Sequence, residues 1–330
     1  MIDGARLSIP VAWEPEKGSV QQQILRIAVI MKNTITSCFS LVQLLTFTFL
    51  NQSVMGQDFP PNPVLKNGYQ LEFNEDFTSS ELDTNKWFPY YLPQWSSKAK
   101  SATNYQIKNN TLILKIDEDQ EPWCPEFNDS IKVSSLQTGV FSGELNSSFG
   151  QHRISENCVV REQQQVSRLY TPQYGYFEIR AKAIGSKNNV CAFWMIGFED
   201  EPYKSAEICI MEIKGEHVKE GQAINGFGLR AFEDTNLADE FFEEPFSIDA
   251  TQFHIYAAEW KPSGIDFFID NKKVKSIRQS PAYEMQFMLN IYEVPINLAL
   301  NKPELTYPKV FQIDYVRAYQ PLAGYLDNRK

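Results

Sequence analysis

Short apolar runs separated by turn residues dominate the sequence from residue 69 to residue 319. In many of these runs apolar and polar side chains alternate with a period of two, which is typical of strands with one buried face. No long run beyond residue 56 has the 3.6-residue period of an amphipathic helix. The predicted strands are 69–73, 105–107, 111–116, 135–141, 158–161, 166–170, 174–184, 190–196, 205–215, 222–229, 253–260, 265–269, 273–277, 285–292 and 310–319, with one helical turn within 74–87. Strands at this spacing indicate an all-β sandwich or barrel.

One predicted strand, SAEICIMEIKG, carries two carboxylates within an isoleucine-rich run. Strict alternation would put Glu207 and Cys209 on one face and Glu212 on the other. A β-bulge at Ile210 or Met211 would return Glu212 to the face of Glu207. Two carboxyl groups about 5–5.5 Å apart perform retaining glycoside hydrolysis, one as nucleophile and one as general acid and base. The alternative is two solvated glutamates on opposite faces of an edge strand.

The run EICIME resembles the signature of glycoside hydrolase family 16, the β-glucanase and laminarinase family, in which the pattern is EIDIME. Other stretches match that family in the same order, namely YGYFEIRAK, AFWM, FHIYAAEWKPSGIDFFIDNKKV, FMLNIYE and FQIDYVRAY. The resemblance spans residues 69–319 and implies a two-sheet antiparallel jelly-roll sandwich, concanavalin-like, with a concave glycan-binding cleft. It also implies that Glu207 is the nucleophile and Glu212 the acid/base.

The chain departs from the family pattern at Cys209, where relatives have Asp. A carboxylate between two others raises their pKa values by like-charge repulsion, whereas a neutral thiol is a small hydrophobe. We therefore expect an active but detuned enzyme. The region after the motif also departs, because residues 223–228 read AINGFG where relatives often carry a His-Gly pattern. This difference leaves the substrate open.

The resemblance implies several sugar-binding residues. Trp194 would lie in the cleft, where its flat indole can stack on the apolar face of a pyranose ring; packing in the core is the alternative. Asn290 and Tyr292 share one strand face. The family often has Asn and Trp at these two positions, so Tyr292 keeps a stacking ring but a smaller one.

Four further residues match family positions. Glu178 and Arg180 share one strand face and resemble the Glu and Arg that relatives use near sugar subsites, although such a pair is more often a surface ion pair. His254 matches a family histidine, for which a structural role is the alternative. Asp314 matches an aspartate that binds a structural calcium in some relatives, a site that needs six to eight oxygen ligands. The chemistry itself needs no metal or other cofactor.

Charge and aromatic content narrow the classes of partner. The 330 residues carry a formal net charge of −10, which argues against nucleic acid or an anionic membrane as partner. Aromatic residues make up 13% of the chain, which fits both a packed β-core and stacking platforms for sugars. We expect a monomer that acts on a polysaccharide and has no stable membrane insertion.

The N-terminal part has the pattern of a signal peptide. Met31 and Lys32 precede an apolar run, 35–50, and Val54 and Gly56 suit the −3 and −1 positions of a cleavage site. An uncleaved anchor is the alternative, but the run is shorter than about 20 residues. The expected segments are an upstream extension without structural role (1–30), the signal peptide (31–56), an extended leader (57–68), the catalytic domain (69–320) and a tail (321–330). The protein is therefore expected to be secreted or periplasmic.

Four cysteines follow Cys38 and allow three fully paired connectivities. Cys124 and Cys158, both near loop-like sequence, are the expected pair. Cys191 lies an odd number of residues from Trp194, so it would point away from a cleft that Trp194 lines. No Cys or His spacing suggests zinc.

Together these patterns predict a secreted, retaining, endo-acting glycosidase. β-1,3-Glucan or mixed-linkage β-1,3-1,4-glucan is the first substrate hypothesis, and galactans such as agar or carrageenan rank below it. One alternative is a glycan-binding protein on the same fold without turnover, which the loss of Asp at Cys209 favours. Another is a transglycosylase, which uses the same covalent intermediate but passes the sugar to a second glycan.

Overall fold

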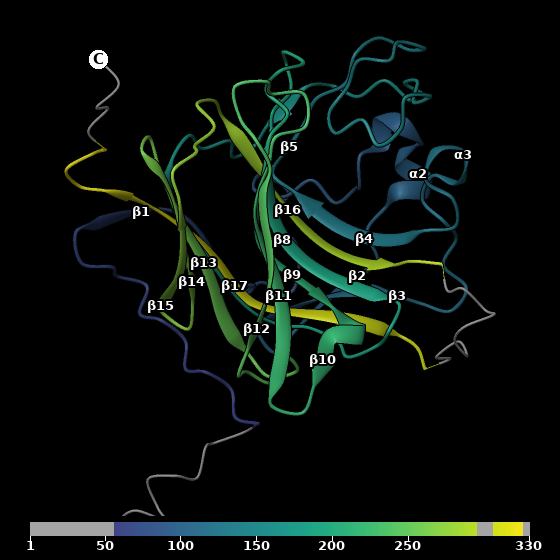
Figure 1. Ribbon diagram of the computed structural model, residues 1–330. Helices are drawn as coiled ribbons and strands as arrows, with labels where there is room; N and C mark the ends of the chain where they lie inside the picture. The colour runs from purple at the N-terminus through teal and green to yellow at the C-terminus, as the bar shows by residue number, and fades with distance from the viewer. Residues whose placement is uncertain (1–55, 296–305, 326–330) are drawn as a thin grey trace, which may run out of the picture. The chain divides into compact units, whose positions relative to one another are not determined.

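Two antiparallel β-sheets make up most of the structure, a computed structural model that describes residues 56–295 and 306–325 (Figure 1). The predicted upstream extension, Cys38 and nearly all of the predicted signal peptide lie outside these residues. Among the described residues, no helix has both the length and the apolar composition needed to cross a lipid bilayer.

The first sheet has eight strands in the order β15-β14-β13-β7-β17-β3-β2, and β1 pairs with the C-terminal half of β17. Its strands are β1 (Tyr69–Glu75), β2 (Tyr105–Lys108), β3 (Thr111–Ile116), β7 (Gly175–Lys182), β13 (His254–Lys261), β14 (Gly264–Ile269), β15 (Lys272–Ile277) and β17 (Lys309–Pro321). We call it the outer sheet.

The second sheet has seven strands in the order β10-β11-β9-β8-β16-β4, and β12 pairs with β11. Its strands are β4 (Lys132–Gln137), β8 (Asn189–Gly197), β9 (Glu207–Lys214), β10 (Val218–Lys219), β11 (Gln222–Arg230), β12 (Glu240–Phe246) and β16 (Met285–Glu293). We call it the β9 sheet. The remaining elements are β5 (Gly139–Val140), β6 (Ser167–Arg168), α2 (Lys98–Ser101), α3 (Pro125–Asn128) and two short 3-10 helices, η1 (Pro93–Trp95) and η2 (Gly215–His217).

The main core lies between the facing surfaces of the two sheets. Phe287 of β16 is fully buried there, and its ring meets those of Phe177 on β7 and Phe193 on β8 edge-on, at centroid distances of 5.5 and 5.4 Å. Edge-to-face pairs at this distance are favourable aromatic contacts. The period-two alternation predicted from the sequence therefore produces the expected two-sheet sandwich.

Three local predictions have clear outcomes. The predicted strands 105–107 and 111–116 are confirmed and pair as a hairpin, whose turn residues Asn109 and Asn110 adopt the left-handed region that asparagine tolerates. The predicted strand 158–161 is a loop that packs on η1 through a hydrogen bond from the Arg161 N–H to the Gln94 carbonyl. The predicted helical turn within 74–87 is a single hydrogen-bonded turn, in which the N–H groups of Lys86 and Trp87 both donate to the Asp83 carbonyl at 3.0 Å.

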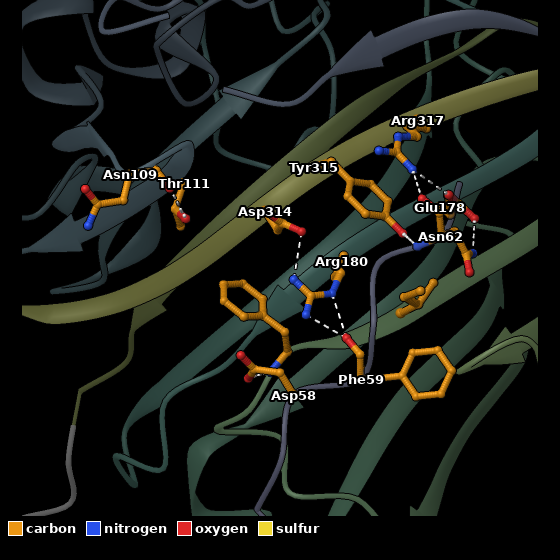
Figure 2. Close-up of polar contacts among 12 residues, drawn as sticks. Asp58, Phe59, Asn62, Asn109, Thr111, Glu178, Arg180, Asp314, Tyr315 and Arg317 are labelled. Carbon is orange, nitrogen blue, oxygen red and sulfur yellow. Dashed lines mark hydrogen bonds and ion pairs between the residues drawn. The ribbon is translucent and has the colours of Figure 1, made fainter. Parts of the chain in front are cut away.

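The leader, residues 57–68, lies across the exposed face of the outer sheet rather than forming a free tail (Figure 2). The Arg180 guanidinium donates to the Phe59 carbonyl at 2.9 and 2.6 Å. The Asn62 side chain donates to Glu178 at 2.9 Å, and Arg317 donates to the Asn62 carbonyl at 2.8 Å. Charged groups of β7 and β17 thus serve as anchors for the leader.

Candidate active site

The strand β9 contains the predicted β-bulge. Its pairing with β8 shifts between Cys209 and Met211, so Ile210 has no partner of its own. The side chains of Ile210 and Met211 both pack into the core between the sheets. Glu212 consequently lies on the same face as Glu207, and both line one cavity. The prediction of a bulge at Ile210 or Met211 is confirmed.

Asn225 of β11 holds the bulge in place. A bulge leaves backbone groups without a regular partner in the ladder. The Asn225 amide oxygen accepts from the N–H of Glu212 at 3.1 Å, and its NH₂ group donates to the carbonyl of Ile210 at 3.4 Å. Asn225 is buried, and a side-chain amide offers the donor and the acceptor that these two groups need. This one side chain therefore fixes the backbone that aims Glu212.

The cavity lies on the face of the β9 sheet that is turned away from the main core. Its volume is about 240 Å³. This is slightly below the range of pockets for drug-sized ligands, about 300–1,000 Å³, and suits a small unit such as one sugar ring. Its lining residues are His152, Val190, Ala192, Trp194, Glu207, Cys209, Glu212, Arg230, Tyr292 and Val294. One part of the lining is charged and the other is apolar or aromatic, as pyranose binding requires.

Most residues of the predicted cleft come together here. Trp194 and Tyr292 both line the cavity with the two glutamates. Asn290 lies behind Trp194 and accepts a hydrogen bond from the indole N–H at 2.6 Å, so it orients the ring. The Tyr292 hydroxyl bonds to the hydroxyl of Tyr91 at 3.3 Å. The aromatic wall is therefore held by polar contacts at its back.

The other predicted substrate-binding residues do not line the cavity. Glu178 and Arg180 belong to β7 of the outer sheet, and they point to the face that the leader covers. His254 belongs to β13 of the same sheet, where Nδ1 lies 2.7 Å from Asp270. The two stacked sheets separate these residues from the cavity. The structure therefore does not bring these residues together with Glu207 and Glu212, because strand alternation shows which side chains share a face but not which sheet they belong to.

Two titratable residues of the cavity, His152 and Arg230, were not predicted. His152 belongs to the loop between β5 and β6, and its ring lies 5.1 Å from that of Trp194. Arg230 ends β11 and is paired in register with Glu207. Its place on the cavity face follows from period-two alternation with Gly226 and Gly228, which is the only sequence signal that could have found it.

Burial sets the charge state of the cavity. It raises the pKa of Glu207 to about 8, an effect that Arg230 opposes and Glu212 reinforces. Burial also raises the pKa of Glu212, against the influence of Arg230 and Lys214. At neutral pH the carboxyl pair therefore retains a proton.

Two further titratable neighbours of the pair, Cys209 and His152, are uncharged at neutral pH. Burial and the two glutamates raise the pKa of the Cys209 thiol well above its usual range. Burial and Arg230 lower the pKa of His152 to about 4. A neutral thiol and a neutral imidazole thus flank the carboxyl pair at pH 7.

The surroundings of Asp314 do not fit a calcium ion. Its carboxylate accepts a hydrogen bond from Arg180 at 2.7 Å, and the same guanidinium also donates to the Phe59 carbonyl (Figure 2). A positive side chain thus stands where a cation would need oxygen ligands. Within residues 56–295 and 306–325, no group of three or more His, Cys, Asp or Glu is placed to hold a metal.

The four described cysteines are all free and buried. The expected bridge between Cys124 and Cys158 is wrong, since Cys124 instead donates to the Trp95 carbonyl at 3.4 Å and packs as a small apolar side chain. Cys191 faces the main core, on the opposite side of β8 from Trp194, as predicted.

Comparisons with known proteins agree with this geometry. A sequence profile described as "Glycosyl hydrolases family 16" matches residues 94–317. A β-glucanase of Acetivibrio thermocellus is 27% identical over 151 residues, which cover 44% of this chain and 42% of that protein. Glucan endo-1,3-β-glucosidase A1 of Niallia circulans is 22% identical over 295 residues, covering 79% of this chain and 39% of that protein. The chain thus spans less than half the length of these curated relatives.

Solved structures give a second comparison. A GlcNAcα1-4Gal releasing endo-β-galactosidase from Clostridium perfringens superposes with a TM-score of 0.71 at 32% identity, covering 82% of this chain and 67% of that one. A laminarinase from Flavobacterium sp. UMI-01 superposes with a TM-score of 0.53 at 21% identity, covering 76% of this chain and all of that one. The predicted jelly-roll fold is confirmed.

Replacing Asn225 by Ala should disturb the carboxyl pair. The change leaves two buried backbone groups of the bulge without partners, which costs about 1–3 kcal/mol for each group. We expect kcat to fall at least about tenfold at 25 °C, because Glu212 loses its fixed position. The control is Leu114→Ala, a buried change in the outer sheet whose cost, about 2–5 kcal/mol, leaves the bulge intact. Equal kcat values for the two variants would contradict this role of Asn225.

The raised pKa of Glu207 predicts a stability effect with a defined sign. The folded state binds a proton at Glu207 up to about pH 8, whereas the unfolded state releases it near the ordinary glutamate pKa of 4.5. Stability from this group is therefore lost as the pH rises through that window. Glu207→Gln has no carboxyl group to titrate, so its stability does not fall in this way as the pH rises. The unfolding free energy of the variant minus that of the parent should therefore grow from near zero at pH 5 to roughly 1–4 kcal/mol at pH 8.

Thermal and urea unfolding at pH 5 and pH 8 measure this difference. The matched control is Glu216→Gln, which changes an exposed glutamate of η2 outside the cavity. An equal gain at both pH values for Glu207→Gln would show that Glu207 titrates as an ordinary glutamate.

Proposed function

Because the chain belongs to glycosyl hydrolase family 16, we propose that it is a retaining, endo-acting β-glycosidase with Glu207 as nucleophile and Glu212 as general acid and base. One observation carries the proposal. The bulge at Ile210 brings both carboxyl groups to one face of β9, within reach of the same guanidinium and inside one cavity with an aromatic wall. A double-displacement reaction uses two carboxyl groups that face the same sugar in this way.

The reaction has two steps. In the first, the Glu207 carboxylate bonds to the anomeric carbon while the glycosidic C–O bond breaks, and the Glu212 proton passes to the leaving oxygen. In the second, Glu212 takes a proton from water, whose oxygen bonds to the anomeric carbon and releases Glu207. The reactive form therefore has Glu207 ionised and Glu212 protonated, which is the one-proton form of the pair. Both steps use carboxyl groups alone and involve no metal.

For the substrate, we propose a glycan that contains β-linked galactose. The likeness to an endo-β-galactosidase supports this choice, because its 32% identity over 82% of this chain exceeds the 27% identity over 44% of the chain shared with a curated β-glucanase. β-1,3-Glucan or mixed-linkage β-glucan is the second candidate, supported by the curated relatives. We further propose that the protein acts as an exported monomer, which its N-terminal pattern and acidic net charge support.

The test is release of reducing ends from a panel of glycans by the full chain. The panel contains a mucin glycan ending in GlcNAcα1-4Gal, agarose, carrageenan, laminarin and mixed-linkage glucan. We expect release from the galactose-containing mucin glycan, and a loss of about 10²–10⁴-fold in Glu212→Gln and at least as much in Glu207→Gln. Glu216→Gln should retain the parent rate.

The products distinguish the alternatives. Fragments shorter than the starting glycan indicate hydrolysis, whereas longer chains indicate transfer of the sugar to a second glycan. Release from laminarin alone would contradict the galactoside hypothesis but support the carboxyl pair. Binding of a glycan without release, with full retention of the fold, would overturn the enzymatic proposal and favour a binding protein.

A further inference from the structure

Arg230 occupies a central place between the two catalytic carboxyl groups. Its Nε lies 3.5 Å from Oε1 of Glu207, and its Nη2 lies 3.7 Å from Oε2 of Glu212. Among the ion pairs of the described residues, no other cation contacts both. The buried Nε–H has no hydrogen-bond partner, so the contact with Glu207 is an electrostatic one at this distance.

The position of the guanidinium is fixed from two sides. Arg230 pairs with Glu207 across β11 and β9, which sets the start of its side chain. The planar group then stacks on Phe241 of β12, with its carbon 3.9 Å from the ring centroid. Gly226, earlier on the same face of β11, leaves room for the Phe241 ring and for Glu212, because an added Cβ would lie only 3.0 Å from that ring and 3.1 Å from Glu212 and would crowd both. The position of the guanidinium is therefore set by strand pairing with Glu207, by stacking on Phe241 and by the glycine at position 226.

The other groups around the pair do not supply this positive charge. From β8, only the uncharged Val190, Ala192 and Trp194 face the cavity. On β9, Lys214 lies 3.9 Å from Glu212 but 2.6 Å from Glu243 of β12, which engages its charge. The remaining titratable groups that face or influence the pair are the neutral Cys209 and His152, the phenols Tyr91 and Tyr292, and the acidic Asp239 and Glu243.

We propose that Arg230 is a positioning residue that sets the charge of the catalytic pair in a site where Cys209 replaces the acidic residue of the family signature. The inference rests on the proposed function. With Glu207 ionised and Glu212 protonated, the positive guanidinium balances the negative Glu207 carboxylate. Glu207, Glu212, Cys209 and Arg230 together then carry no net charge. Such a balance suits a site with little water, because isolated buried charges are costly. An aspartate at position 209 would add a negative charge that this balance does not include.

The experiment measures the two carboxyl groups directly, without substrate. Glutamate labelled with ¹³C at Cδ is titrated by NMR in the full chain, and Glu207→Gln and Glu212→Gln assign the two signals. In Arg230→Met we expect both titrations to move to higher pH by about one to two units, since an opposite charge at this distance lowers a carboxyl pKa by that order. Arg230→Lys should restore at least half of the shift, because it keeps the charge.

The matched control is Arg168→Met. Arg168 also stacks on a phenylalanine ring, Phe198, and also contacts two carboxylates, Asp200 and Glu284, but it does not line the cavity. This change should leave both titrations where they are in the parent. Thermal unfolding of each variant identifies any that fails to fold, and Arg230→Gln, which also removes the charge, provides the test if Arg230→Met is lost.

Kinetics give the second readout on the glycan that the parent cleaves. The acid limb of kcat/KM should shift upward with the Glu207 titration, so kcat/KM measured on that limb falls about tenfold for each unit in Arg230→Met, with rescue in Arg230→Lys. Unchanged titrations in Arg230→Met would overturn the proposal even if activity fell. Shifted titrations in a chain that cleaves no glycan would support the charge role and contradict the proposed function instead.

Discussion

The unpaired residue Ile210 in strand β9 determines which face of its sheet carries the Glu212 side chain. Without the bulge at Ile210, Glu212 would point into the apolar core between the sheets, where an unpaired carboxylate is strongly unfavourable. With the bulge, two apolar side chains enter the core in succession and both glutamates face the same cavity. The distortion is stable because the Asn225 side chain hydrogen-bonds to the two backbone groups that the bulge leaves unpaired, the Glu212 N–H and the Ile210 carbonyl. Catalytic geometry here depends on a backbone irregularity and on the amide that satisfies it.

The charges of the cavity follow from this geometry. Burial alone would favour two protonated carboxyl groups, which cannot supply a nucleophile. Arg230 opposes burial at both positions, while the neutral Cys209 adds no negative charge between them. The departure of position 209 from the family signature is therefore compatible with a working pair, because a cation on the neighbouring strand can regulate the same two groups. Three adjacent strands, β9, β11 and β12, each contribute a necessary part of this arrangement.

Much of this could be predicted from the sequence, because period-two patterns and turn residues are local signals. They gave most of the strands, the pair Glu207 and Glu212, and the need for a bulge. The strand β12 was missed, since EFFEEPF is acidic, contains a proline and lies at an edge of the sheet. Arg230 and His152 were missed because their roles depend on pairing between strands and on loop conformation. Residues of the outer sheet such as Glu178 were misplaced, as alternation does not identify which sheet a strand joins.

The central claim is that the bulge produces a pair of carboxyl groups for double displacement. The most direct measurement is the configuration of the newly formed anomeric centre, followed by ¹H NMR in the first minutes of cleavage, before mutarotation. The account predicts that the β-anomer appears first and the α-anomer only later, because two successive inversions restore the original configuration. An α-anomer as the first product would mean a single displacement by water, and would contradict the assignment of Glu207 as the nucleophile.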